Sequence, residues 1–102
     1  MAYDEGLAER VRTALADEEG VTERKMFGGI AFMVGGNMAL GVRDDDLMVR
    51  LGDAEEALAQ PHTRQSMMGE RPMKGIILVS QDADLGAWIE RGVAYARSLP
   101  AK

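Results

Sequence analysis

Few side chains in the sequence could do chemistry, and His62 with Ser66 is the clearest pair. His62 is the single histidine, and imidazole is the side chain whose ordinary pKa lies near neutral pH. A serine hydrolase needs its serine on a rigid turn and its histidine oriented by a carboxylate. Neither context is present, because the pair lies in a segment without clear periodicity and no Gly-x-Ser-x-Gly motif occurs. We therefore predict a solvated loop histidine, no catalytic residues and no enzyme activity.

Three further patterns resemble ligand-binding motifs but lack the spacing that binding requires. The acids at 44–46 are consecutive, whereas a calcium loop needs spaced ligands and a distal glutamate, so we expect a hairpin turn there. The eight methionines could bind Cu(I), but they have no cysteine or histidine partners. The glycine pairs at 28–29 and 35–36 lack the lysine and the following helix of a phosphate loop. We predict no metal and no cofactor.

The segment from residue 60 to 75 is basic in an otherwise acidic chain. Its cationic or titratable side chains are His62, Arg64, Arg71 and Lys74, and its single acid is Glu70. An anion or an acidic partner could bind to these side chains. If the anion is a small carboxylate or phosphate, Arg50 could bind it together with them. The alternative is that these charges stay solvated and balance the acidic helices.

Composition narrows the class of protein. The chain of 102 residues is long enough for one domain, which we place at 1–102. Its formal net charge of −5 makes direct nucleic-acid binding unfavourable, since such binding neutralises phosphates with basic side chains. No apolar run reaches the roughly 20 residues of a membrane span, and the N-terminus shows no signal sequence, so we expect a cytoplasmic protein.

Periodicity predicts the elements that must position these residues. Helical patterns occur over 4–20, 53–60 and 82–100, where Pro100 ends the last helix, and the first and last of these segments are the longest. Between 22 and 51 the period is two, with glycine and aspartate turns between four strands, and 76–80 reads as a fifth strand. The order is α-β-β-β-β-α-β-α. We predict a two-layer α+β fold, an antiparallel sheet of about five strands with helices on one face.

Alternation along these strands assigns side chains to two faces. Towards the helices we expect Ile30, Phe32, Val34, Met38, Leu40, Val42, Leu47, Val49 and Leu51. The opposite face would carry Ala31, Met33, Ala39, Gly41 and Met48, with Arg43 and Arg50 near the strand ends. So apolar a second face suggests a protein-docking surface and a homodimer. The alternative is that the C-terminal helix or the 60s loop wraps over this face.

Several segments together resemble the N-terminal domain of the TfoX/Sxy family of competence regulators. They include "VTERKMFGGIAFMVGGNMALGV", "EALAQPHTR", "RPMKG" and "LGAWIERGVAYARSLP". The resemblance implies a secretion-chaperone-like α+β fold and no catalytic residues. In full-length members this domain precedes a C-terminal domain, and the protein assists transcription of DNA-uptake genes beside a cyclic-AMP receptor-type activator. The motif positions are Arg24, Lys25, Met26, Phe27, Gly28 and Gly29, then Arg71, Pro72, Met73, Lys74 and Gly75.

Two functional hypotheses follow. The first is a non-enzymatic protein-interaction module that serves as an accessory regulator of transcription, with a transcription regulator as a possible partner. The second is a domain that binds a small anionic ligand through the 60–75 segment, either as a binding module or as an enzyme.

Overall fold

The computed structural model describes residues 3–26 and 28–101. Its elements are α1 (Glu5–Ala14), β1 (Val21–Met26), β2 (Gly29–Val34), β3 (Asn37–Arg43), β4 (Asp46–Arg50), α2 (Glu55–Leu58), β5 (Thr63–Met68), β6 (Arg71–Val79) and α3 (Leu85–Ser98). No helix in the described part of the chain is both long and apolar enough to cross a membrane.

The two main helices begin at aspartate caps. The carboxylate of Asp4 accepts a hydrogen bond from the backbone N–H of Leu7 at 3.1 Å, and that of Asp84 accepts one from Ala87 at 3.2 Å. Such caps pair backbone donors that the first helical turn leaves free. The short α2 is different, because Ala54 precedes it and makes no side-chain cap. The carboxylate of Asp53 instead accepts a hydrogen bond from the backbone N–H of Glu55.

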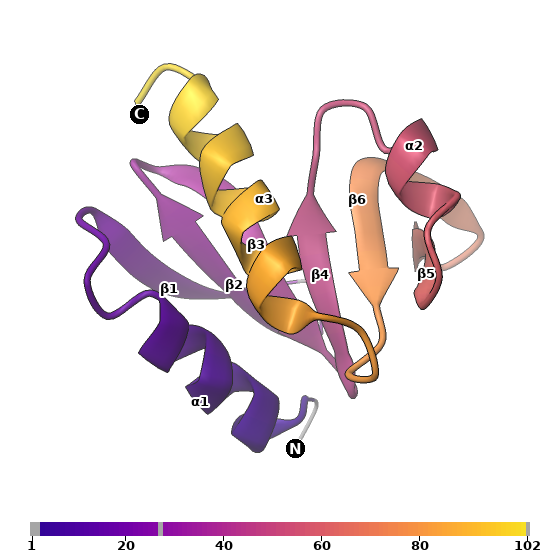
Figure 1. The fold of residues 1–102 in the computed structure, drawn as a ribbon, viewed down its shortest axis with the longest axis horizontal. Coiled ribbons are helices and arrows are strands. Elements are labelled where there is room, and N and C mark those ends of the chain that lie inside the picture. Colours follow the sequence, from indigo (N-terminus) through magenta and orange to yellow (C-terminus); the bar gives the residue numbers. More distant parts are fainter. Residues whose placement is uncertain (1–2, 27, 102) are drawn as a thin grey trace.

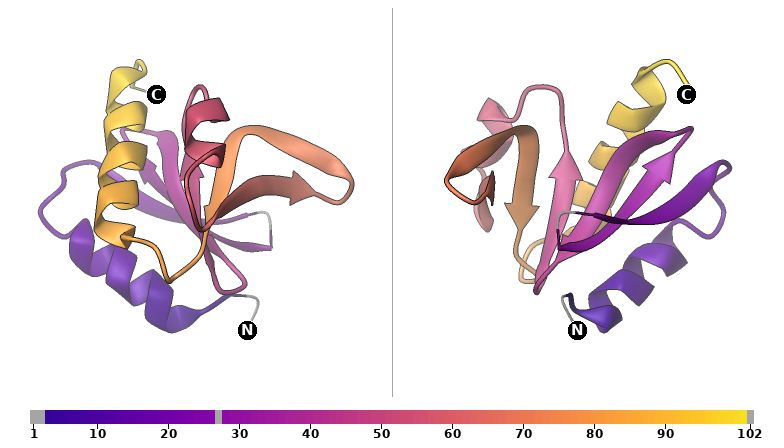
Figure 2. Two further views of the ribbon diagram at one scale, coloured as in Figure 1. Left: turned by 45° about the vertical axis from the view of Figure 1, so that its right-hand side comes forward. Right: turned by 180° about the vertical axis from the view of Figure 1, so that it is seen from behind.

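All six strands form one antiparallel sheet in the order β1-β2-β3-β4-β6-β5. Helices α1 and α3 lie across the same face of this sheet (Figure 1). The β5–β6 hairpin bends away from the plane of the other strands (Figure 2). The predicted α+β class, the antiparallel sheet and the helices on one face are therefore confirmed.

The prediction of about five strands was wrong for the segment 60–75. It forms β5, a turn at Gly69 with φ 62°, and the first half of β6, so the order is α-β-β-β-β-α-β-β-α. The period of two fails in β5 because the register shifts between Gln65 and Met67, which interrupts the alternation of side chains. The fifth predicted strand is also longer than expected and begins at Arg71.

A second irregularity corrects the predicted faces of β3. Phe32 pairs with Leu40 and Met33 pairs with Met38, so Ala39 is an extra residue between two paired positions. A bulge of this kind reverses the alternation on one side of it. Ala39 therefore joins the helix-covered core, whereas Met38 joins the opposite face, and both assignments made from alternation were wrong.

The main core lies between the sheet and the two long helices. Helix α3 contributes Leu85, Trp88, Ile89, Val93 and Ala96, and α1 contributes Leu7, Ala8 and Val11. Gly92 is buried where α3 crosses β3. A Cβ at this position would lie 2.7 Å from the backbone oxygen of Ala39, so the helix and the sheet approach each other closely here.

Candidate functional site

The second face of the sheet holds a cluster of methionines that is largely closed. Ala31 and Met48 are each 1% exposed, and Met38 packs with them. Partly buried neighbours surround these three: Met26, Met33, Met73, Ile76 and Leu78. Gly41 is also buried, because the side chains of Met38 and Met48 lie over it. Of the five residues predicted to form a docking face, only Met33 stays partly accessible on this side.

The sheet covers this face by curling over itself. The guanidinium of Arg43, in β3, donates to the backbone oxygen of Met67, in β5, at 2.5 Å. Two strands stand between β3 and β5 in the sheet order, so this bond requires strong curvature. The alternative prediction, that the 60s segment wraps over the second face, therefore describes the structure better than the open docking face.

Polar contacts hold the β5–β6 hairpin in this shape. The two N–H donors of the Gln65 side-chain amide are shared among the backbone oxygens of Ser66, Met73 and Ile76, which lie 3.0, 2.8 and 3.2 Å from Nε2. The buried hydroxyl of Ser66 donates to Sδ of Met73 at 3.3 Å. These contacts supply partners where the register shift breaks the strand ladder, so the hairpin can keep its bent course.

A groove of about 470 Å³ opens beside the methionine cluster. Its lining residues are Arg24, Met26, Met33, Gly36, Met38, Arg50, Lys74 and Ile76. They come from β1, β2, β3, β4 and β6, with Gly36 in the turn between β2 and β3. The groove thus combines an apolar floor with three cationic side chains and no acid.

Strand register explains how three distant residues reach one groove. Arg24 lies opposite Ala31, and Arg50 lies opposite Ile76, so both arginines share the face of the methionine cluster. The guanidinium of Arg50 also stands 5.6 Å from the ring centre of Tyr95, in α3, which is a cation–π contact. Lys74 enters from β6.

The predicted anion site of the 60–75 segment is not assembled as proposed. Arg64 forms an ion pair with Asp46. Arg71 is exposed next to the turn of the hairpin, where it pairs with Met68. His62 lines a different pocket of about 240 Å³, beside Trp88 and the 82–84 turn. Of the four residues, only Lys74 lines the groove, and Arg50 joins it there.

The other candidate chemistries also lack their geometry. His62 is exposed and Ser66 is buried, and these two make no hydrogen bond to each other in the described structure. The 44–46 turn joins β3 to β4, as predicted, with Asp44 at φ 53° and its oxygen bonded to the N–H of Asp4. No group of three histidine, aspartate or glutamate side chains suited to a metal occurs among the residues described.

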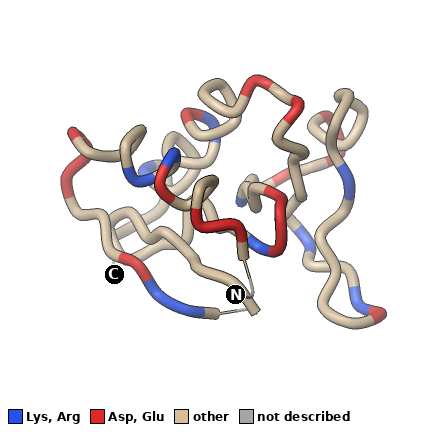
Figure 3. Tube along the Cα trace, turned by 90° about the horizontal axis from the view of Figure 1, so that it is seen from below, with Lys and Arg blue, Asp and Glu red and all other residues tan. Residues whose placement is uncertain are grey.

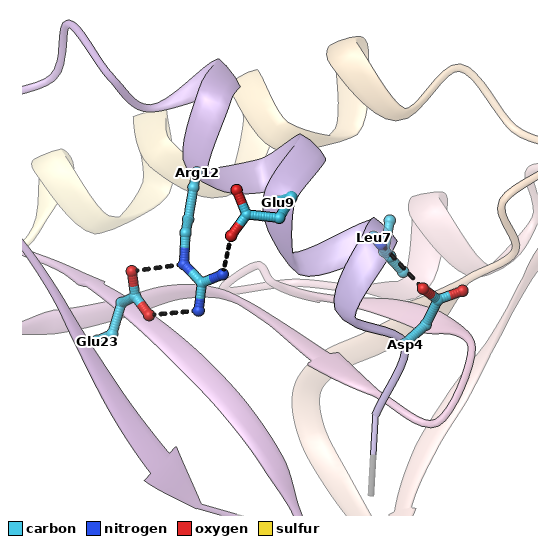
Figure 4. A network of polar contacts seen from close by, with 5 residues as sticks. All are labelled: Asp4, Leu7, Glu9, Arg12 and Glu23. Atoms are coloured by element: carbon cyan, nitrogen blue, oxygen red, sulfur yellow. Dashed lines mark hydrogen bonds and ion pairs between the residues drawn. The ribbon is translucent and has the colours of Figure 1, made fainter. Parts of the chain in front are cut away.

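Charged residues are spread along the whole trace (Figure 3). Several of them form ion pairs on the surface away from the groove. The guanidinium of Arg12 donates to Glu23 at 2.9 and 2.8 Å and also bonds Glu9 (Figure 4). These hydrogen bonds raise the pKa of Arg12 and lower that of Glu23. The pKa of Asp4 is lowered by the side-chain amide of Gln81 and by the N–H of Leu7.

Sequence reasoning missed Arg24 as a site residue. It stands in the "RKMFGG" segment, whereas Lys74 stands in "RPMKG", and nothing in their spacing shows that both line one groove. The signal available was their membership of the two quoted motifs, which the fold brings together. Phe27, which belongs to the same "RKMFGG" motif as Arg24, lies outside the described residues.

These features define a small α+β domain whose single sheet is covered by helices on one face and partly by its own hairpin on the other. The sequence model of the TfoX N-terminal domain matches residues 13–96. The chain therefore belongs to this family, as the resemblance of its motifs predicted. Comparisons with curated proteins and with solved structures gave no match.

Proposed function

We propose that this protein is a non-enzymatic interaction module with a competence-regulator-like role, acting in the cytoplasm as an accessory to a transcription regulator. Membership of the TfoX N-terminal domain family supports the regulatory role. The observation that carries the interaction role is the exposed methionine pair of β5, Met67 and Met68, which are 37% and 50% exposed.

The hairpin suits the presentation of these methionines. It projects from the body of the domain (Figure 2), and the contacts of Gln65 and Arg43 hold it in one shape. A rigid support lowers the entropy lost on binding, and methionine side chains adapt to the surface of a partner. We therefore propose the tip of the hairpin, in place of the centre of the second face, as the docking surface.

The test is affinity capture with the purified domain, comparing wild type with a Met67→Ser/Met68→Ser variant. The matched control is Ala94→Ser, an exposed substitution on α3. We expect a transcription activator or a polymerase subunit to be retained by wild type and control and lost from the double variant. Equal retention by all three forms would show that the hairpin tip is not the contact.

A second copy of the chain is the other partner that we propose for this tip. Light scattering during size-exclusion chromatography measures the mass in solution, and we expect a dimer for wild type. The Met67→Ser/Met68→Ser variant should be a monomer if the tip forms the dimer contact. A monomeric wild type would contradict the homodimer.

A further inference from the structure

The groove beside the methionine cluster is positively charged, although the protein as a whole is acidic. The protein has a net charge of −5, yet Arg24, Arg50 and Lys74 line one groove and no aspartate or glutamate lines it with them. Among the described residues, the ion pairs formed by arginine involve Arg12, Arg64, Arg91 and Arg97, and none involves the three groove cations. No carboxylate therefore neutralises these three charges in the described structure, although the guanidinium of Arg50 also stands over the ring of Tyr95.

The floor of the groove is apolar and lies below the surface. Met38 is 6% exposed, and Met26, Met33 and Ile76 are partly buried around it. A broad protein surface does not reach such a floor, whereas a narrow alkyl or aromatic group does. The volume of about 470 Å³ also falls in the range of roughly 300–1,000 Å³ that is usual for small-molecule sites.

We propose that this groove binds a small organic anion with an apolar body, its carboxylate or phosphate held by Arg24, Arg50 and Lys74 and its tail placed over the methionines. Arginine side chains give a planar anion paired hydrogen bonds, and lysine adds a point charge. The flexible thioethers of Met33 and Met38 can adjust to tails of different shape. This site is separate from the hairpin tip of the proposed function and does not depend on it.

The probes are sodium decanoate and decyl phosphate below their micelle concentrations, titrated against the folded domain and followed by two-dimensional NMR. Decanol supplies the tail without charge, and inorganic phosphate supplies the charge without a tail. We expect saturable binding of at least one decyl anion, with shifts at residues lining the groove, and binding at least about tenfold weaker for decanol and for phosphate. Which anion binds more tightly identifies the head group.

The variants are Arg24→Gln and Lys74→Gln, both at exposed positions, so the fold should persist. The matched control is Lys25→Gln, which removes the same charge one residue away. Lys25 lies opposite Ile30, a residue of the helix-covered core, and therefore faces away from the groove. We expect each groove variant to weaken binding about tenfold and the control to leave it within about twofold.

Several results would overturn the proposal. They are no saturable binding of either anion, equal binding of decanol, and an equal loss in Lys25→Gln and Arg24→Gln. An acidic peptide that shifts the same groove resonances when neither decyl anion does would also overturn it, and would make the groove a second protein-docking site.

Discussion

Gly92 lies where α3 crosses the sheet, and its missing side chain sets the distance between them. A Cβ there would be 2.6 Å from Cδ2 of Leu40 and 2.7 Å from the backbone oxygen of Ala39. The leucine side chain can move, but the backbone oxygen of Ala39 lies buried in β3 between two paired neighbours and can shift only if the strand shifts. Gly86, in the first turn of the same helix, differs because its Cβ would meet only a carboxylate oxygen of Asp84, at 3.5 Å.

Gly92→Ala should therefore lower the free energy of unfolding by about 1–3 kcal/mol, the usual range for overpacking, although alanine is the better helix former by about 1 kcal/mol. Gly86→Ala is the matched control and should be neutral or stabilising by up to about 1 kcal/mol. Urea unfolding measures both. If both variants gained stability, the close approach of α3 to β3 would be wrong.

Glu23 gives a pH-dependent prediction. Its folded-state pKa is lowered, chiefly by the hydrogen bonds from Arg12, so its contribution to stability is present above its unfolded pKa of about 4.5 and is lost as the pH falls through the folded value. Glu23→Gln should cost up to about 1 kcal/mol at pH 7, and the difference from wild type should shrink below pH 4.5.

Glu90→Gln is the control for this pH series, since Glu90 has no ion pair among the described residues. Urea unfolding of the three proteins between pH 3 and 7 gives the comparison. A Glu23→Gln effect that stayed constant across this range would mean that the carboxylate charge is not what stabilises the fold.

The elements show which parts of the structure could be read from the sequence. The long helices were predictable because their apolar periods and capping aspartates are local signals, and the first four strands because glycine and aspartate turns separate them. The β5 strand was not, since Gln65 and Ser66 are polar residues whose partners come from the curved hairpin itself. The bulge at Ala39 could not be predicted from the sequence either, because alanine fits either face of a sheet.

The groove was predictable only in part, for the same reason. Arg50 and Lys74 were candidates for anion binding, but their convergence depends on the pairing of β4 with β6. Arg24 reaches the groove through the register of β1 with β2, which places it opposite Ala31. The pairing of strands that are distant in the sequence cannot be predicted from local residue spacing. The sequence therefore indicated which residue types could bind an anion, but not which of them lie together in the groove.

The hairpin depends on the amide of Gln65, which donates to three backbone oxygens. Gln65→Leu removes all three bonds and should destabilise β5 and the first half of β6 by about 1–3 kcal/mol. Amide hydrogen exchange should become faster in this hairpin than in β2 and β3. Arg64→Gln, which removes one exposed ion pair, is the matched control and should cost less than about 1 kcal/mol. Unchanged exchange in Gln65→Leu would contradict the bracing role.

The molecule as a whole has a continuous main core, to which α1, α3 and the central strands all contribute. A single cooperative transition is expected of such a domain. Trp88, the one tryptophan, lies in this core with the guanidinium of Arg91 4.7 Å from its ring centre, so its fluorescence reports on α3.

We expect the urea midpoint from Trp88 fluorescence to coincide with that from far-ultraviolet circular dichroism, which reports on all elements. Two separate midpoints would show that a part of the sheet unfolds independently of the helices, and the β5–β6 hairpin is the part that we expect to do so. Repeating both measurements with Gln65→Leu would then identify that part, because only the hairpin midpoint should fall.

The extra residue in β3 also constrains how this sequence can change in length over evolution. Ala39 sits between the pairs Phe32–Leu40 and Met33–Met38, so deleting its codon would join these pairs in a regular ladder and leave Met38 beside Met48. Deleting a codon at any other position in β3 would instead turn the residues on one side of the deletion to the opposite face. Substitutions along β3 alter one face at a time, whereas a deletion or insertion at these other positions alters both at once. Descendants of this chain should therefore vary in length at the turns between strands, and within β3 only at Ala39.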